Sequence, residues 1–216
     1  MQHISLTNIL TAEKQYRTNL INCLSGVRTA QLLGTQNAAG QTNLAIFNSA
    51  MHIGAHPPLL GLIFRPLDAQ QHSLQNILAT QHYTLNTVPI DRLTSAHQCS
   101  ARYPQEVSEF AANGFTPWYS EQHAAPYVEE STLRIGLKLV EKIDIALNGT
   151  MLLIGEVQEI WVTENALETD GNIRFDQLEA AGVGGLDTYY RFEAAARFGY
   201  AKPNVSLQSY LVSLRD

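Results

Sequence analysis

The stretch from residue 42 to residue 76 decides the fold of this chain, and it reads TNLAIFNSAMHIGAHPPLLGLIFRPLDAQQHSLQN. Thr42–Ala50 is mostly apolar and is predicted to be a strand. Gly54–Pro58 predicts a turn, because proline fixes its own φ and disfavours helix at the residue before it. Leu59–Phe64 is predicted to be a second, buried strand, and Gln71–Gln81 a helix with apolar residues at helical spacing.

Small polar residues stand where the first strand ends and where the helix begins. Asn48 and Ser49 occupy positions where a core strand would prefer Val or Ile, and Ser73 is a candidate helix cap. The first turn of a helix has unpaired N–H groups and the positive end of the helix dipole. The stretch therefore brings together a polar strand end and a helix start suited to a phosphate.

The strongest strand pair is predicted later in the chain. Leu133–Ile145 and Thr150–Val162 flank Asn148-Gly149, a sequence typical of a type I′ turn, so a long antiparallel hairpin is expected. Short strands joined by hairpins, with few helices, favour a closed antiparallel barrel with helices packed outside it.

The two ends of the chain give weaker patterns. Ser5–Gly26 predicts one helix with an apolar stripe that includes Tyr16 and Leu20, and Gly26 is a candidate helix terminator. The tail from Gly182 has no clear period. The remaining predicted elements are strands over Val27–Thr35 and Tyr83–Pro89, a turn over Asn37–Gly40, short helices over Leu93–Ser100 and Gln105–Asn113, irregular chain over Thr116–Tyr127 and Glu164–Asn172, and one or two helical turns over Phe175–Ala181.

Length and composition exclude several classes of protein. The chain has 216 residues, 45% of them hydrophobic, which suits one domain with a full-sized core. A net charge of −6 argues against nucleic-acid binding. The N-terminus does not resemble a signal peptide and no apolar run could span a membrane, so a cytoplasmic protein is expected. Cys23 and Cys99 lie far apart and are expected to be two reduced thiols.

Six fragments of the sequence, in order, resemble the flavin reductase-like family, whose members are FMN-binding split barrels. The first two are Asn43–Ser49 followed by Pro57-Pro58, and Gln71–Ile77. The other four are Glu109-Phe110 with Gly114 and Thr116-Pro117, Ala125-Pro126 with Val128–Ser131, Gly155-Glu156-Val157, and Asp170–Ile173.

The resemblance implies a mainly β fold, an antiparallel Greek-key split β-barrel with peripheral helices. Residues 1–216 would form a single FMN-binding domain, with residues 1–25 as an N-terminal helical extension. It also implies a homodimer, NAD(P)H as the electron donor, and an unknown electron acceptor. The cofactor-binding residues expected from it are Asn48, Ser49, Ala50, Met51, Arg65, Gln71, His72, Ser73 and Ser100.

Two positions depart from the family pattern. Ile46 stands where the family usually has proline, and Gln71 where it has a basic residue, so Arg65 or His72 is expected to supply the phosphate-binding cation. Ser73 could equally be a plain helix cap, Arg65 a solvent-facing charge, and Asn48 and Ser49 an exposed strand face. The alternatives to a reductase are an FMN-bound electron carrier that serves a partner protein and a flavin-binding protein without reductase activity.

No side chain is predicted to act as acid, base or nucleophile, because the isoalloxazine would carry the chemistry. His52 and His56 could lie beside the ring edge or be ordinary turn residues, and their spacing does not indicate a metal site. Residues 187–190 could close the site late in the chain or pack at a subunit contact. Rossmann and P-loop patterns are absent from the sequence, so a nicotinamide dinucleotide would bind against an exposed flavin face.

Overall fold

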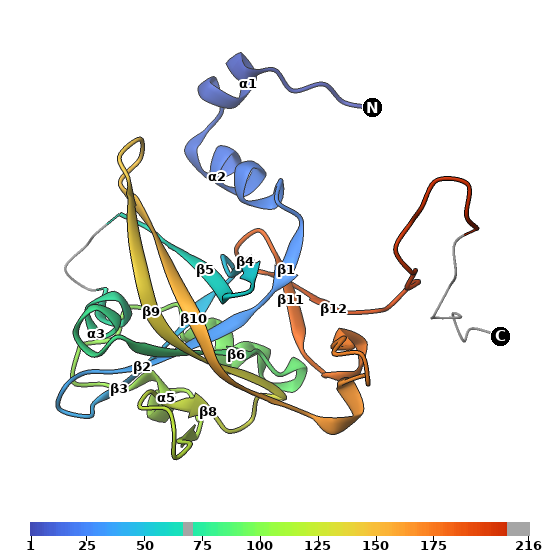
Figure 1. The fold of residues 1–216 in the computed structure, drawn as a ribbon. Coiled ribbons are helices and arrows are strands. Elements are labelled where there is room, and N and C mark those ends of the chain that lie inside the picture. Colours follow the sequence, from blue (N-terminus) through green and yellow to red (C-terminus); the bar gives the residue numbers. More distant parts are fainter. Residues whose placement is uncertain (67–70, 207–216) are drawn as a thin grey trace.

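The computed structural model describes residues 1–66 and 71–206. Its centre is a seven-stranded antiparallel sheet with the order β3-β2-β6-β9-β10-β5-β4 (Figure 1). These strands are β2 (Gln31–Gln36), β3 (Thr42–Phe47), β4 (Met51–Ala55), β5 (Pro58–Phe64), β6 (His82–Thr87), β9 (Leu133–Ile145) and β10 (Thr150–Val162). The prediction of a mainly β, antiparallel fold with helices outside the sheet is confirmed.

The β9–β10 hairpin has the predicted strand bounds, but its turn differs from the prediction. Ile145 pairs with Thr150, so four residues form the loop and not the two of a type I′ turn. The Gly149 N–H donates to the Ile145 carbonyl at 2.9 Å, and Gly149 has φ +73° whereas Asn148 has no positive φ. Asn148 instead accepts hydrogen bonds through its side chain from Thr150. The predicted turn type is therefore wrong, although Asn148 and Gly149 do end the hairpin.

Two predicted strands differ in detail from the structure. The predicted strand Tyr83–Pro89 is β6, which begins one residue earlier, ends at Thr87 and is buried on both faces between its neighbours β2 and β9. The expected strand over Thr42–Ala50 ends at Phe47, and β4 is a separate strand that the sequence did not indicate. Residues 56 and 57 turn the chain between β4 and β5, as the proline pattern predicted.

The sheet curls until its two ends approach each other, and a seam remains between them. β3 is one edge strand and β4 the other, although only residues 48–50 separate them in the chain. In the seam the Ser49 hydroxyl donates to the Ile63 carbonyl of β5 at 2.9 Å. The seam therefore lies between β3 and the end of β5 beyond Gly61, where β4 no longer pairs with it, and β3 and β5 are not hydrogen-bonded as neighbouring strands.

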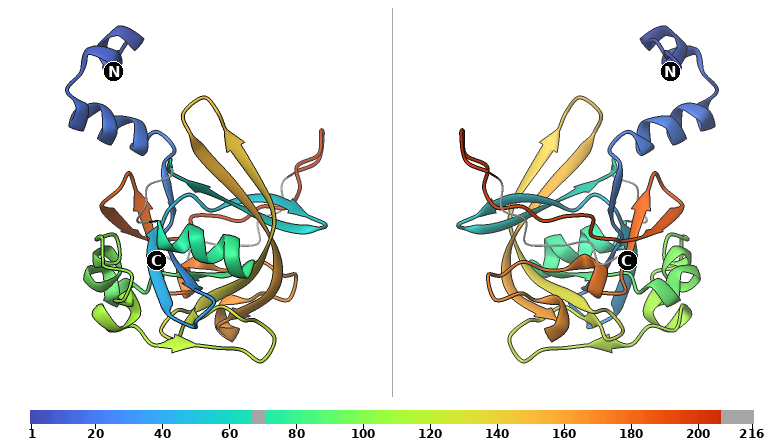
Figure 2. Two further views of the ribbon diagram at one scale, coloured as in Figure 1. Left: turned by 90° about the vertical axis from the view of Figure 1, so that its left-hand side faces the viewer. Right: turned by 90° about the vertical axis from the view of Figure 1, so that its right-hand side faces the viewer.

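The helices lie on the outside of this sheet. α3 (His72–Thr80) packs against β2 and β3 and confirms the predicted helix, with Leu74 and Ile77 fully buried (Figures 1 and 2). Gln81 ends it in the left-handed conformation, φ 64°. The other short elements are η1 (Ile90–Arg92), α4 (Leu93–Gln98), α5 (Glu109–Ala112), the strand pair β7 (Pro117–Trp118) and β8 (Tyr127–Val128), η2 (Glu164–Ala166) and η3 (Phe175–Gln177).

The N-terminal segment forms two helices where one was predicted. α1 (Leu6–Thr11) and α2 (Lys14–Cys23) are separated at Ala12 and Glu13, and Arg17 donates back to the carbonyls of Leu10 and Ala12 across the break. Both helices project from the body (Figures 1 and 2). Among the described residues of α1 and α2 none is buried, so the expected apolar stripe has no core to pack against.

A second, three-stranded sheet joins the N-terminal and C-terminal parts of the domain. The predicted strand Val27–Thr35 breaks at Ala30, and β1 (Val27–Thr29) pairs with β11 (Ala181–Gly184), which pairs with β12 (Thr188–Arg191). The sequence did not indicate β11 and β12. β11 contains two glycines and lacks a clear alternation, and its partner β1 lies more than 150 residues earlier in the chain. β12 is ordered by pairing with β11.

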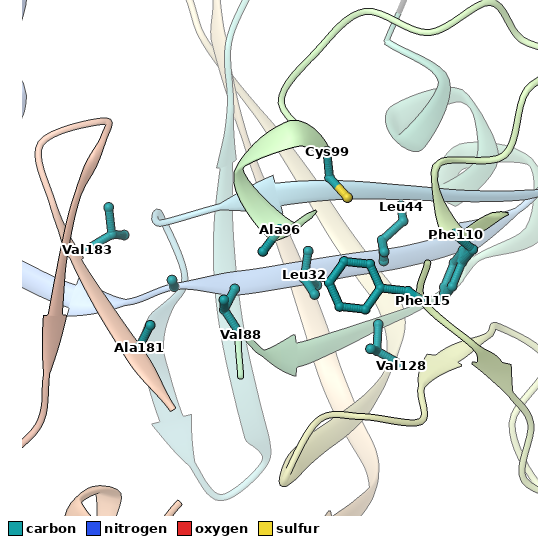
Figure 3. Packing of buried hydrophobic residues seen from close by; sticks show 11 residues of the cluster. Leu32, Leu44, Val88, Ala96, Cys99, Phe110, Phe115, Val128, Ala181 and Val183 are labelled. Carbon is teal, nitrogen blue, oxygen red and sulfur yellow. The ribbon is translucent and has the colours of Figure 1, made fainter. Parts of the chain in front are cut away.

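Buried side chains form clusters on the two faces of the curled sheet. Figure 3 shows one of them, in which Leu32 and Leu44 share a cluster with Phe110, Phe115 and Cys99, the residue that follows α4. A second cluster lies beneath α3 and includes Leu74, Ile77 and Tyr83. Both cysteines are free thiols, Cys23 exposed and Cys99 buried, as expected for reduced thiols.

Gly155 in β10 allows the Tyr83 ring to lie against the strand backbone. A Cβ at position 155 would overlap the Tyr83 hydroxyl and come within 2.8 Å of its Cζ. We therefore expect Gly155→Ala to lower the free energy of unfolding by about 1–3 kcal/mol, measured by urea denaturation. In the double variant Gly155→Ala/Tyr83→Phe the cost of the alanine should be smaller, because the overlapping oxygen is gone. An alanine that costs the same in both backgrounds would contradict this contact.

Candidate functional site

A cavity of about 610 Å³ opens at the seam between β3 and β5. Ligand sites in proteins commonly have volumes of about 300–1,000 Å³. Its wall consists of β3 and the residues after it, the end of β5, the start of α3, the segment after α4, and the junction between α2 and β1. The cavity therefore lies where the sheet fails to close.

The start of α3 forms one end of the cavity, and among the described residues no side chain caps its first N–H groups. The helix begins at His72, and its N-cap residue Gln71 makes no side-chain capping bond. Ser73 lies inside the first turn, so its expected role as the helix cap is wrong. Its buried hydroxyl accepts a hydrogen bond from the Asn43 amide at 2.8 Å and keeps its own hydrogen to donate. An uncapped helix start beside a serine hydroxyl is suited to bind an anion.

Gln71 ties the start of α3 to the end of β5. Its side-chain Nε2 donates to the carbonyls of Pro66 at 2.8 Å and Arg65 at 3.3 Å. The amide nitrogen is thereby bound to the backbone, and the side-chain Oε1 is buried with no hydrogen-bond partner among the described residues.

Cationic side chains lie around the same end of the cavity. Arg65, His72 and Arg102 line it. Among ion pairs formed between described residues, none involves Arg65. A guanidinium and a helix start together can bind a phosphate with charge-assisted hydrogen bonds.

A buried carboxyl group, Glu109, also lines this end. Its Oε2 accepts a hydrogen bond from the Leu44 backbone N–H at 3.0 Å, and the residue is only 6% exposed. Burial raises the pKa of Glu109 above its ordinary value, while the Leu44 N–H and the positive charge of His72 act in the opposite direction. The Asn43-Leu44 and Glu109-Phe110 fragments of the family pattern are thus in direct contact.

Polar groups at the end of β3 form the opposite end of the cavity. The Asn48 amide Nδ2 donates to the Gly185 carbonyl at 2.7 Å, and the Ser49 hydroxyl to Ile63. These bonds fix both side chains and leave the Asn48 oxygen and the Ser49 oxygen as acceptors toward the cavity. Both residues are half-buried in the cavity wall and follow β3, which ends at Phe47.

Most of the predicted site residues meet in this cavity. Its lining includes Asn48, Ser49, Arg65, Gln71, His72, Ser73 and Ser100. Ala50 and Met51 are not part of the lining: Ala50 packs against the core beneath α3 and Met51 begins β4. Their predicted contact with a cofactor stays a prediction.

The histidines and the late tyrosines lie elsewhere. His52 is on β4 and His56 in the turn after it, both exposed and outside the cavity lining. His97 Nδ1 lies 2.9 Å from the Tyr189 hydroxyl, so Tyr189 packs against α4, and residues 187–190 are not part of the cavity lining.

Sequence reasoning missed several residues of the cavity wall. Arg28 and Arg102 are cations that line it, and Ile21, Asn22 and Ser25 reach it from the end of α2. Arg102 follows the predicted Ser100 by two positions and could have been considered with it. The others are brought to the site only by pairing of β1 with β11, which no local pattern indicates.

Neither a metal-binding cluster nor a membrane-spanning helix is found in the described part of the chain. Among residues 1–66 and 71–206, no group of three or more His, Cys, Asp or Glu side chains is placed to hold a metal ion. Within the same residues, no helix has the length and apolar character needed to cross a lipid bilayer.

Comparison with known proteins assigns this architecture to a class. A model of the flavin reductase like domain matches residues 27–179. A split-barrel protein from Shewanella frigidimarina NCIMB 400, assigned to the flavin reductases, superposes with a TM-score of 0.89 at 43% sequence identity, covering 93% of this chain and 100% of that one. A search of the curated proteins found no match.

Two more distant structures share the fold. The 2-nitrobenzoate 2-nitroreductase of Pseudomonas fluorescens superposes with a TM-score of 0.78 at 21% identity, covering 95% of this chain and 99% of that one. The flavoredoxin of Desulfovibrio vulgaris (Miyazaki F) superposes with a TM-score of 0.71 at 21% identity, covering 94% of this chain and 98% of that one. The fold is thus a split barrel, as expected from the sequence. The chain belongs to the flavin reductase-like family.

Glu109 should make stability depend on pH in a defined direction. The folded state holds the Glu109 proton more tightly than the unfolded chain, so this contribution to the free energy of unfolding decreases as pH rises from the unfolded toward the folded pKa. Glu109→Gln cannot titrate. We expect its stability, measured by urea denaturation, to improve relative to wild type as pH rises above the ordinary range of a carboxyl group.

The matched control for this experiment is Glu106→Gln, because Glu106 is exposed three residues away. Its stability relative to wild type should change little with pH. A Glu109→Gln variant that loses stability relative to wild type as pH rises would show that the buried carboxyl is charged and stabilising.

Proposed function

We propose that this chain binds FMN in the seam cavity and acts as a flavin reductase-like oxidoreductase that takes hydride from NAD(P)H. The observation that carries the proposal is the placement of an uncapped helix start and two fixed amide and hydroxyl acceptors at opposite ends of one cavity. FMN has a phosphate at one end and a ring edge with N–H and carbonyl groups at the other.

The phosphate fits the α3 end of the cavity. The first N–H groups of α3 and the Ser73 hydroxyl would donate to its oxygens, and Arg65 and His72 would balance its charge. Glu109 lies close by, and its raised pKa reduces the repulsion that a carboxylate would cause. Gln71, tied to Pro66 and Arg65, would act only by holding the helix start in place.

The isoalloxazine fits the strand end. The Asn48 and Ser49 oxygens would accept from the ring N–H, and the apolar side chains of Ile46 and Phe47 provide wall for a flat ring. When bound, FMN supplies the hydride-accepting chemistry at its N5 atom. The protein binds the ring, orients it and limits access to it, and none of the described residues is assigned as an acid, base or nucleophile.

Two alternatives fit the same cavity. A protein that keeps FMN bound and only carries electrons would serve a partner, and a flavin-binding protein without reductase activity would need no donor site. A homodimer and a cytoplasmic location remain expectations from the resemblance and the sequence. The electron acceptor is unassigned.

Reconstitution tests the proposal as a whole. Purified protein incubated with FMN should be yellow after gel filtration, with about one flavin per chain, and the flavin absorbance should bleach anaerobically on addition of NADH or NADPH. Bound flavin that bleaches only with an added redox partner would favour the electron carrier. Protein that retains no flavin by mass spectrometry would overturn the cofactor assignment.

The phosphate site has its own test. Arg65→Ala/Ser73→Ala should weaken FMN binding by about 10–100-fold, because charge-assisted hydrogen bonds to the phosphate are lost. Riboflavin binding, which lacks the phosphate, should change much less. Dissociation constants follow from flavin fluorescence titration, with Lys138→Ala, an exposed cation outside the cavity lining, as the control. Equal losses for the two flavins would place the phosphate elsewhere.

A further inference from the structure

The seam cavity extends past the strand end to the N-terminal extension. Ile21, Asn22 and Ser25 of the α2 end line it, together with Arg28 of β1. The first three residues precede residue 27, where the match to the family model begins. This part of the wall therefore comes mostly from chain outside the family domain.

Arg28 lies far from the phosphate end of the cavity. Asn43, which contacts Ser73, pairs with Thr35 of β2. From Thr35 the chain runs through β2 and, after the break at Ala30, through β1 back to Arg28, seven residues that span at most about 23 Å at about 3.3 Å per residue. Along this path Arg28 lies toward the other end of the cavity from Ser73.

Arg28 instead lies near the strand end that carries Asn48. Val27 pairs with Gly184, and the neighbouring Gly185 carbonyl accepts the hydrogen bond of Asn48. Arg28 is only half-buried, and among ion pairs between described residues none involves it. Its charge is available to a ligand in the cavity.

The N-terminal wall is held firmly to the barrel. Arg28 pairs with Val183 in the β1–β11 ladder, and the Gly26 N–H donates to the Cys23 carbonyl at 3.0 Å. A Cβ at position 185 would lie 2.8 Å from the Cys23 sulfur, so the α2 end rests directly on this glycine. The α2 end thus contacts the barrel at Gly185, whose carbonyl accepts the Asn48 hydrogen bond.

We propose that Arg28, with Asn22 and Ser25, forms a second anionic subsite that binds a phosphate of the nicotinamide dinucleotide donor. This inference rests on the proposed function, because it names the place of the donor in the same cavity. The position at the mouth favours a ligand that enters and leaves: Ser25 is exposed and Ile21 is 46% exposed. The Asn22 amide Nδ2 donates to the Thr18 carbonyl at 2.8 Å and keeps a second hydrogen, and the Ser25 hydroxyl donates to the Asn22 carbonyl at 3.4 Å. The Arg28 guanidinium is therefore the main donor to phosphate oxygens in this subsite.

The test uses the full chain loaded with FMN and titrated with the oxidised dinucleotides NADP⁺ and NAD⁺ by isothermal calorimetry, so that binding is measured without turnover. Arg28→Gln should raise the dissociation constant for NADP⁺ by about 10-fold or more, while the FMN dissociation constant stays within about twofold. A loss confined to NADP⁺ identifies the 2′-phosphate as the group bound, and an equal loss for NAD⁺ identifies the pyrophosphate.

Two further variants serve as controls. Arg17→Gln removes the same charge from α2 at a residue outside the cavity lining and should leave both dinucleotide affinities unchanged. Arg28→Lys keeps the charge without the forked geometry and should recover part of the affinity.

Three results would overturn the proposal: unchanged dinucleotide affinity in Arg28→Gln, an equal loss in Arg17→Gln, or a loss of FMN affinity as large as that of the dinucleotide. Each would leave the reductase assignment standing if the wild-type protein binds FMN and is reduced by the donor. Wild-type protein that binds no flavin would reject the proposed function itself.

Discussion

The structure depends on how the free edge of β3 is satisfied. A buried edge strand must find partners for its backbone groups. Here the buried Glu109 carboxyl accepts the Leu44 N–H, and the adjacent Asn43 side chain bonds to Ser73 of α3. Side chains thus replace a neighbouring strand, and β3 need not pair with β5. The sheet stays open at this seam, and the cavity occupies the opening.

The fold could be predicted where sequence patterns are local. The β9–β10 hairpin, β5 and α3 follow from apolar period and turn residues, because each pattern reports the environment of its own segment. The single N-terminal helix was wrong, since an apolar stripe predicts burial only if a surface lies opposite it. β11 escaped prediction because its two glycines leave no alternation and its partner β1 is distant in the chain, and β12 because it pairs with β11.

The candidate site, like the fold, could be predicted where its residues lie close together in the sequence. Ser49, Arg65 and Ser73 belong to one continuous stretch, and the resemblance identified it. The Gln71 departure could be understood only from its bonds to Pro66 and Arg65, which a sequence does not show. Arg28 has no motif around it, and only the pairing of β1 brings it to the cavity.

The two cysteines differ in a way that bears on chemical labelling. Burial raises the pKa of the Cys99 thiol to about 12, whereas Cys23 is exposed and rests on Gly185. Because thiolates are the reactive species, a maleimide at neutral pH should modify Cys23 in strong preference to Cys99. A fluorophore attached there would stand beside the mouth of the seam without any engineered substitution. The native chain thus offers a reporter of whatever enters or leaves.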